Sequence, residues 1–194
     1  MKINKPSAQI SDKQKIREDL QLLIDQPAAA EEAVCPNCQK HLPFQCSADC
    51  KDAPAALSSD PAKFPLETKV VPLVFELSAL RVFETNWSCE GHVDDKGRLW
   101  RMPQVCFYSK SPIYPQLLLR YINRLEHEKK LSYPWQVVLA DYGSVNGVTY
   151  NLEPKLGIAP ENVHMGKLQQ DLVTLSENLF FGLKSLAREI MKEL

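Results

Sequence analysis

Four of the six cysteines lie close together before residue 51, at spacings typical of a metal site. They form a CxxC pair and a CxxxC pair that are separated by seven residues: Cys35, Cys38, Cys46 and Cys50. A short turn lets both thiolates of a pair face one cation, and two such pairs complete the tetrahedral set that Zn²⁺ favours. In a reducing compartment, clustered cysteines point to a metal and not to disulfides. We therefore expect a structural zinc ion bound by these four thiolates.

His41 lies between the two pairs, so five candidate ligands compete for four positions. A Cys3His set that includes His41 is the alternative to four thiolates. The residues around the pairs are mostly Pro, Ala and polar types, which bury too little apolar surface to order a segment unaided. In closed zinc sites the bound ion supplies that folding energy. The pattern therefore predicts a zinc-knuckle-like segment over residues 35–50, with a structural role.

A second set of reactive side chains lies in the sequence Thr-Asn-Trp-Ser-Cys-Glu-Gly-His at positions 85–92. If the Cys89 and His92 side chains converge in this loop, His92 can lower the pKa of the thiol or share a metal with it. Gly91 can adopt a positive φ and let a ligand approach the main chain closely. The candidate catalytic residues are Cys89, His92 and Glu90, and the candidate ligand-binding residues are Thr85, Ser88, Arg98 and Arg101.

Basic and aromatic side chains surround this loop. Arg98, Arg101 and Lys110 follow it, and Trp87 and Trp100 lie alongside. Such interleaving can receive a phosphate or an unstacked base. The whole chain has 23 Lys+Arg against 24 Asp+Glu, a balance that calls for neither nucleic acid nor a membrane surface. We expect a small or anionic ligand at the loop, and nucleic acid is a partner that the overall charge does not support.

The motif Thr-x-x-Ser-Cys-Glu-Gly-His, between a helix and a strand, resembles a recurring motif of uncharacterised bacterial and phage proteins. Locally, the loop is also similar to the Ser-Cys-Ser-Gly-Arg loop of the wybutosine-synthesis tRNA-modifying family. Glu90 and His92 stand where that family has Ser and Arg, so the guanidinium expected to meet a phosphate is missing. The resemblance covers about residues 73–109. It implies a site lined by Ser88, Cys89, Glu90 and His92, and a role in RNA modification follows from it alone.

The composition fits an ordinary globular domain with a small appendage: 194 residues, 44% hydrophobic and 24% charged. Residues 1–63 form an N-terminal arm in this interpretation. The arm has a helix at about residues 11–25, which ends before Pro27, and then the cysteine segment and a Pro- and Ala-rich linker. Regular apolar periodicity after the linker predicts a core domain over residues 64–194.

Helices and strands alternate within the predicted core domain. Apolar spacing predicts a helix from Pro72, a second helix that carries Leu118 to Leu125, and a long terminal helix with an apolar stripe from Leu168 to Ile190. Short apolar runs predict strands at 104–109, 135–140 and 148–152, and the last two join in a hairpin at Asn146-Gly147.

This order indicates an α+β fold, a two-layer sandwich of a small mixed sheet with helices mainly on one face. The first two strands, linked by a helix, run parallel if they are neighbours. The stripe on the terminal helix is expected to face the core, and its length also permits a homodimer.

No apolar run approaches the roughly 20 residues that span a bilayer, and the N-terminus lacks the apolar region of a secretory signal. We therefore expect a cytoplasmic protein without membrane contact. Two functions remain open. The first is a zinc-stabilised binding protein that recognises an anionic or nucleotide-like ligand through residues 88–92. The second is an enzyme in which Cys89 is a nucleophile or metal ligand, His92 is a base or ligand, and Glu90 orients it.

Overall fold

The computed structural model describes residues 10–26, 67–109, 111–144, 147–155, 157 and 162–194. The predicted zinc-knuckle-like segment, with Cys35, Cys38, Cys46, Cys50 and the alternative ligand His41, lies outside the described residues. The predicted boundary at residues 63 and 64 also lies outside them. Within the described residues, no helix is both long enough and apolar enough to cross a membrane.

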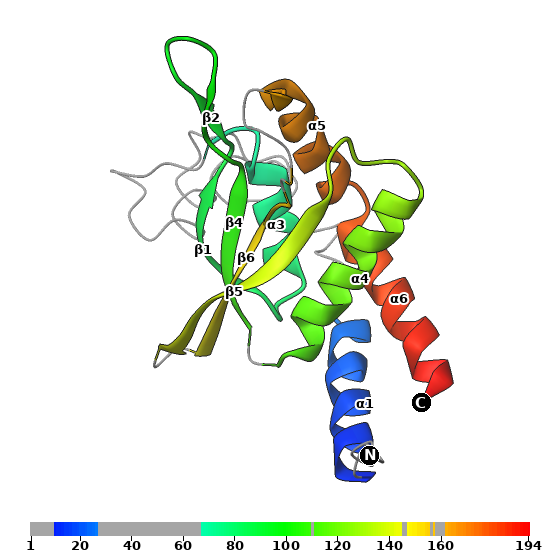
Figure 1. Cartoon of the computed structure of the whole chain (residues 1–194). Coiled ribbons are helices and arrows are strands. Elements are labelled where there is room, and N and C mark those ends of the chain that lie inside the picture. The colour runs from blue at the N-terminus through cyan, green and yellow to red at the C-terminus, as the bar shows by residue number, and fades with distance from the viewer. Residues whose placement is uncertain (1–9, 27–66, 110, 145–146, 156, 158–161) are drawn as a thin grey trace, which may run out of the picture.

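The described elements confirm an α+β fold (Figure 1). Two helices precede the first strands, a third separates the strands, and two more end the chain. In chain order they are α1 (Ile10–Ile24), α3 (Val71–Ala79), β1 (Glu84–Cys89), β2 (His92–Val93), β3 (Leu99–Arg101), β4 (Gln104–Ser109), α4 (Ile113–His127), β5 (Trp135–Ser144), β6 (Gly147–Pro154), α5 (Met165–Ser176) and α6 (Leu179–Glu193). The helix predicted at about residues 11–25 is confirmed as α1.

The main sheet has the strand order β1-β4-β6-β5, and every neighbouring pair is antiparallel. The pairing therefore differs from the expected mixed sheet. The strands β4 and β5 are not neighbours, because β6 lies between them and pairs with both. The condition for a parallel pair is thus not met. A separate two-stranded sheet joins β2 to β3.

The segment that we expected to be a loop at residues 85–92 begins as the edge strand β1. Its register against β4 shifts between Thr85 and Trp87, which makes Asn86 the extra residue of a bulge. On the far side of the bulge, Ser88 lies opposite Val105 and Cys89 opposite Gln104. Sequence periodicity missed this strand because a bulge breaks the simple alternation of buried and exposed residues.

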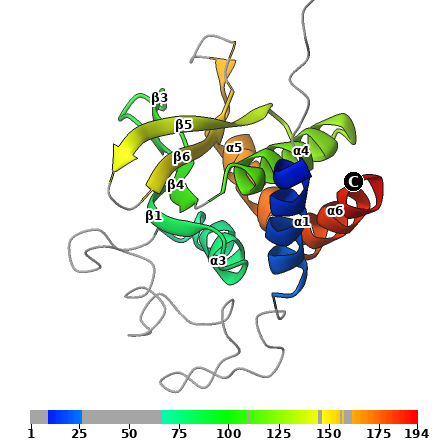
Figure 2. The same cartoon turned by 90° about the horizontal axis from the view of Figure 1, so that it is seen from below.

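The helices gather on one side of the sheet (Figure 2). The inward-facing residues Val105 and Phe107 of β4 are fully buried, as is Leu152 of β6. The same core includes Leu20 and Leu23 of α1, which are 1% and 0% exposed, so α1 packs as part of this layer. Asp19 of α1 adds two hydrogen bonds to the α4 region, from the Ser111 hydroxyl (2.6 Å) and the Tyr114 hydroxyl (3.1 Å).

The single long terminal helix that we expected is wrong, because the chain breaks between α5 and α6. Glu177 is extended and Asn178 adopts the left-handed conformation, with φ of +61°. Asn tolerates that conformation better than most residues. The apolar stripe of both helices faces the core, as predicted: Leu168, Leu172, Leu175, Leu179 and Leu183 are at most 1% exposed.

Candidate metal centre

Three potential metal ligands converge where β1 turns into β2. The Cys89 thiol, the His92 imidazole and the Glu67 carboxylate each place one donor atom within 4.8 Å of the other two. Cys89 is the last residue of β1 and His92 is the first of β2, and Glu67 lies just before α3. Within the described part of the chain, this is the only group of three or more His, Cys, Asp or Glu side chains with that geometry.

Gly91 makes the turn between Cys89 and His92 possible. Its φ of +87° lies in the region that favours glycine. A β-carbon at this position would lie 2.8 Å from Met165 Sδ and 2.9 Å from Pro103 Cδ, closer than real contacts allow. The tight turn and the packing of Met165 therefore both need a glycine, and together they bring the thiol and the imidazole to the same point.

Main-chain hydrogen bonds fix Glu67 against this turn. Its Oε1 lies 2.8 Å from His92 Nε2, and its Oε2 accepts a 2.6 Å hydrogen bond from the Glu90 N–H. In return, Glu90 Oε2 accepts a 2.7 Å hydrogen bond from the Lys69 N–H. The two carboxylates thus clamp the segment before α3 to the β1–β2 turn. The carboxylate that contacts His92 is that of Glu67, and the Glu90 carboxylate, expected to orient His92, binds Lys69.

The electrostatic environment of Cys89 disfavours a free thiolate. The side chain is 2% exposed, and this burial raises the pKa of the thiol. The charge of Glu67 raises the pKa further. The Gly91 N–H, 3.4 Å from Sγ, and the charge of Arg101 both lower it. Since the net pKa shift is upward, the thiol carries its proton at neutral pH and is a poor free nucleophile. A divalent cation would replace that proton.

The donor set suits zinc. Thiolate, imidazole and carboxylate are the three protein ligand types that Zn²⁺ binds, at bond lengths of about 2.0–2.3 Å. In a tetrahedral site, ligand atoms at those lengths lie about 3.3–3.8 Å apart. The 2.8 Å contact between Glu67 and His92 would open slightly, and donors up to 4.8 Å apart would close by about an ångström. A tetrahedral ion held by these three donors has a fourth position that none of the described His, Cys, Asp or Glu side chains fills.

A cation lies between two indole rings next to this cluster. The Arg101 guanidinium carbon is 5.2 Å from the centre of the Trp87 ring and 5.8 Å from that of Trp100. The strand pairing sets this arrangement, because Arg101 lies opposite His92 in the β2–β3 ladder. Trp100 is 70% exposed and its ring centre lies 5.9 Å from that of His92. The cluster is thus flanked by a positive charge and an exposed aromatic surface.

The other predicted ligand-binding residues lie elsewhere. The Thr85 hydroxyl is 3.0 Å from that of Ser78 on α3, and Ser88 lies opposite the buried Val105, so both face the helices. Arg98 forms an ion pair of 2.6 Å with Asp94 in the exposed β2–β3 turn. Of that set, only Arg101 lies against the cluster.

Glu67 is the ligand that sequence reasoning missed. It lies 22 positions before Cys89, in a segment without a recognisable motif. Its placement depends on the packing of α3 against β1, which is a tertiary contact. The sequence signal that could have suggested it is the position of a carboxylate directly before the predicted helix at Pro72.

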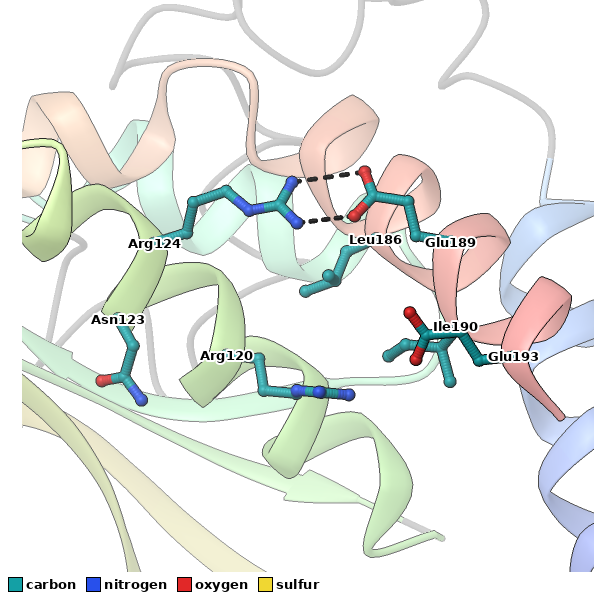
Figure 3. A pocket seen from close by; sticks show the side chains of 7 residues that line it. All are labelled: Arg120, Asn123, Arg124, Leu186, Glu189, Ile190 and Glu193. Atoms are coloured by element: carbon teal, nitrogen blue, oxygen red, sulfur yellow. Dashed lines mark hydrogen bonds and ion pairs between the residues drawn. The ribbon is translucent and has the colours of Figure 1, made fainter.

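A different hollow lies between α4 and α6 (Figure 3). Arg124 reaches from α4 to α6, where its guanidinium forms a 2.6 Å ion pair with Glu189. Arg120 and Glu193 also line the hollow. The acidic and basic groups offset one another there, and the lining holds neither a thiol nor an imidazole. The chemistry therefore favours the Glu67–Cys89–His92 cluster as the functional site.

Comparison with known proteins adds no relative: no family model, curated protein or solved structure matches the chain. The function must therefore be argued from the geometry of this cluster.

Proposed function

We propose that the protein binds zinc at Glu67, Cys89 and His92 and uses the metal to recognise a ligand. The observation that carries this proposal is the convergence of the three donor atoms within 4.8 Å. Three protein ligands with a fourth position left open are typical of zinc sites that bind a substrate or an activated water. A closed structural site would fill all four positions. The ligand-recognition site predicted at residues 88–92 is, in this proposal, centred on a metal ion.

The exposure of the three ligands supports an open site. Cys89 is buried, whereas the side chains of His92 and Glu67 are 36% and 32% exposed. A bound ion would therefore be coordinated by the buried thiolate on one side and be open to solvent on the other. Bound there, zinc would supply a Lewis acid for an oxygen donor of the ligand. Arg101, beside the cluster, would favour a ligand that carries negative charge.

A metal-centred enzyme is the second candidate, and the raised pKa of Cys89 favours it over an enzyme with a free cysteine nucleophile. In either function the Cys89 sulfur acts as a ligand. The predicted structural zinc at Cys35, Cys38, Cys46 and Cys50 is a separate proposal, and it predicts a second ion per chain. We also retain cytoplasmic location as a proposal.

Metal stoichiometry of the purified, reduced full chain tests this proposal. Native mass spectrometry should find two zinc ions per chain, and one ion in Cys89→Ser, His92→Ala and Glu67→Gln. Cys106→Ser and His164→Ala are matched controls, because neither residue belongs to the cluster. Both controls should keep two ions.

Unchanged metal content in Cys89→Ser, His92→Ala and Glu67→Gln would show that the cluster does not bind metal. A Co²⁺-substituted protein in which Cys35, Cys38, Cys46 and Cys50 are all changed to Ser offers an independent check. Its sulfur-to-cobalt charge-transfer band should disappear when Cys89→Ser is added, and a band that persists there would contradict Cys89 as a ligand.

A further inference from the structure

The sheet face that carries no described helix has a hollow of about 640 Å³. That volume is within the usual range of about 300–1,000 Å³ for small-molecule sites. Its wall comes from three strands of the main sheet, β1, β4 and β6, with one residue of β5. The side chains that matter for recognition are Asn86, Trp87, Gln104, Cys106, Tyr108 and Asn151.

The wall of the hollow is polar, aromatic and uncharged. Three side-chain amides, from Asn86, Gln104 and Asn151, supply donors and acceptors. Trp87 and Tyr108 supply flat surfaces, and none of the lining residues is charged. This combination suits a neutral planar group with hydrogen-bonding atoms at its edge. A nucleobase has those properties, since every base has a π-face and an edge of donors and acceptors.

One polar atom in this wall lacks a partner. The Asn86 side chain hydrogen-bonds the Cys106 thiol, but its Oδ1 is buried and accepts no hydrogen bond from the part of the chain that the structure describes. An unsatisfied buried acceptor costs about 1–3 kcal/mol, and native proteins contain few of them. Asn86 is also the extra residue of the β1 bulge, a feature often found next to functional sites. Because this oxygen has almost no accessible surface, a ligand donor reaches it only if the Asn86 side chain turns towards the hollow.

The hollow neighbours the metal centre through Trp87, which lines it and contacts the Arg101 guanidinium. Residues directly opposite in an antiparallel pair point to the same face. Trp87 is paired with Cys106 and Cys89 with Gln104, so the Cys89 side chain leaves β1 on the face that bears the hollow. The Arg101 guanidinium lies over the Trp87 ring, and Arg101 is paired with His92 in the β2–β3 ladder. A ligand seated on Trp87 therefore has a cation, and then the metal ligands, at one end.

We propose that this hollow binds the base of a single nucleoside phosphate, whose phosphate is directed by Arg101 towards the Glu67–Cys89–His92 site. The neutral amide wall fits the base, and the cation and the open zinc position fit the anionic end. This inference rests on the proposed function only for the phosphate end. The base site depends on the sheet face itself.

Titration calorimetry of the zinc-loaded full chain tests the inference. The probes are the four ribonucleoside 5′-monophosphates, the matching nucleosides, inorganic phosphate and a single-stranded oligonucleotide. At least one monophosphate should bind saturably, and Asn151→Ala and Trp87→Leu should each weaken it by about tenfold or more. Asn123→Ala, in the hollow between α4 and α6, is the matched control and should leave binding unchanged.

Arg101→Gln should weaken the monophosphate by about tenfold and leave the nucleoside almost unaffected, since only the phosphate meets the guanidinium. The inference is overturned if no monophosphate binds, or if inorganic phosphate binds as tightly as the nucleotides. An oligonucleotide that binds far more tightly than any monophosphate would overturn the choice of a single nucleotide.

Metal counts keep the two proposals distinct. Two zinc ions without nucleotide binding overturn the base site and leave the metal centre standing. Nucleotide binding by a chain that holds no ion at the cluster overturns the metal centre and supports the base site.

Discussion

Two carboxylates in different parts of the fold show how similar groups acquire different roles. Asp171 on α5 is 1% exposed, and it accepts hydrogen bonds from the Ser132 N–H (2.8 Å), the Tyr133 N–H (3.0 Å) and the Trp135 indole N–H (3.2 Å). Glu67 also accepts a main-chain N–H, but its other oxygen meets the His92 imidazole beside a thiol, and its side chain is 32% exposed.

The two carboxylates differ in whether their oxygens can still accept a further ligand. All the donors around Asp171 are neutral N–H groups of the fold itself, so this carboxylate joins α5 to the segment before β5 and has no room for a ligand. One partner of Glu67, the His92 imidazole, belongs to the candidate metal cluster, and the Glu67 side chain is 32% exposed. A saturated carboxylate stabilises the fold, whereas an unsaturated cluster can bind an ion.

The largest effect should come from Asp171→Ala, which leaves three N–H donors without their acceptor. We expect the free energy of unfolding to fall by about 4 kcal/mol, because each unsatisfied buried donor costs about 1–3 kcal/mol and relaxation recovers part of the sum. Urea denaturation measures this. Asp171→Asn should cost about half as much, since its remaining oxygen still accepts.

Asp94→Ala is the matched control for this variant. Asp94 also accepts from two main-chain N–H groups and one side-chain N–H, of Lys96 and Arg98, but in an exposed turn. Water can replace those bonds, so we expect a far smaller loss than in Asp171→Ala. Equal losses at Asp94 and Asp171 would show that burial does not separate the two roles.

Zinc should stabilise the chain through the Glu67 cluster and leave the Asp171 network untouched. At a free zinc concentration about a hundred times the dissociation constant, a single site adds about 2.7 kcal/mol to the free energy of unfolding. We expect this gain, as a rise in the urea midpoint, in a variant with Cys35, Cys38, Cys46 and Cys50 all changed to Ser, which keeps the Glu67 cluster. The gain should vanish when His92→Ala is added. A gain that survives His92→Ala would assign the effect to other ligands.

The sequence predicted some of the polar residues of these two regions and missed others. Cys89 and His92 were found because they are three positions apart with a glycine between them, so local geometry alone brings them together. Glu67 and Asp171 could not be found in the same way. Each reaches its partners across the fold, over 23 residues for Glu67 and Glu90 and 39 for Asp171 and Ser132, and such contacts leave no short-range pattern.

The α+β class and most helices followed from apolar periodicity, which depends on a single buried face. Two features escaped it for physical reasons. The bulge at Asn86 interrupts the alternation of β1, and the left-handed Asn178 interrupts a stripe that is continuous in sequence. Of the predicted ligand set, Thr85 and Ser88 share the Cys89 strand but face the helices, a distinction that only the register against β4 reveals.

Gly91→Ala should lower the free energy of unfolding by less than Asp171→Ala does, and it should also disturb the metal cluster. The positive φ and the contact with Met165 Sδ together predict a loss of about 2 kcal/mol and weaker zinc binding. Gly97→Ala is the control, because Gly97 has a φ of +75° but nothing within 4 Å of an added β-carbon. It should lose about 1 kcal/mol and bind zinc normally. Normal zinc affinity in Gly91→Ala would show that the tight turn does not position the ligands.

The smallest effect concerns Glu76, a carboxylate between the two extremes. It is half-buried on α3 and accepts a 2.8 Å hydrogen bond from the Phe180 N–H in the first turn of α6. Burial raises the pKa of this carboxyl above 4.5, and the bond from Phe180 opposes the rise. The folded state therefore holds the Glu76 proton to a higher pH than the unfolded state does. The stability that this proton provides is complete below pH 4.5 and is lost as the pH rises through the folded pKa.

Glu76→Gln keeps an acceptor for Phe180 but cannot ionise. The unfolding free energy of the wild type relative to this variant should therefore fall as the pH rises above 4.5, by less than about 1 kcal/mol because water screens the exposed part of the group. Urea denaturation of both proteins at several pH values measures the difference. A difference that grows with pH would mean that the start of α6 stabilises the ionised form. Glu76 would then resemble Asp171, a carboxylate held by N–H donors, more than a group disfavoured by burial.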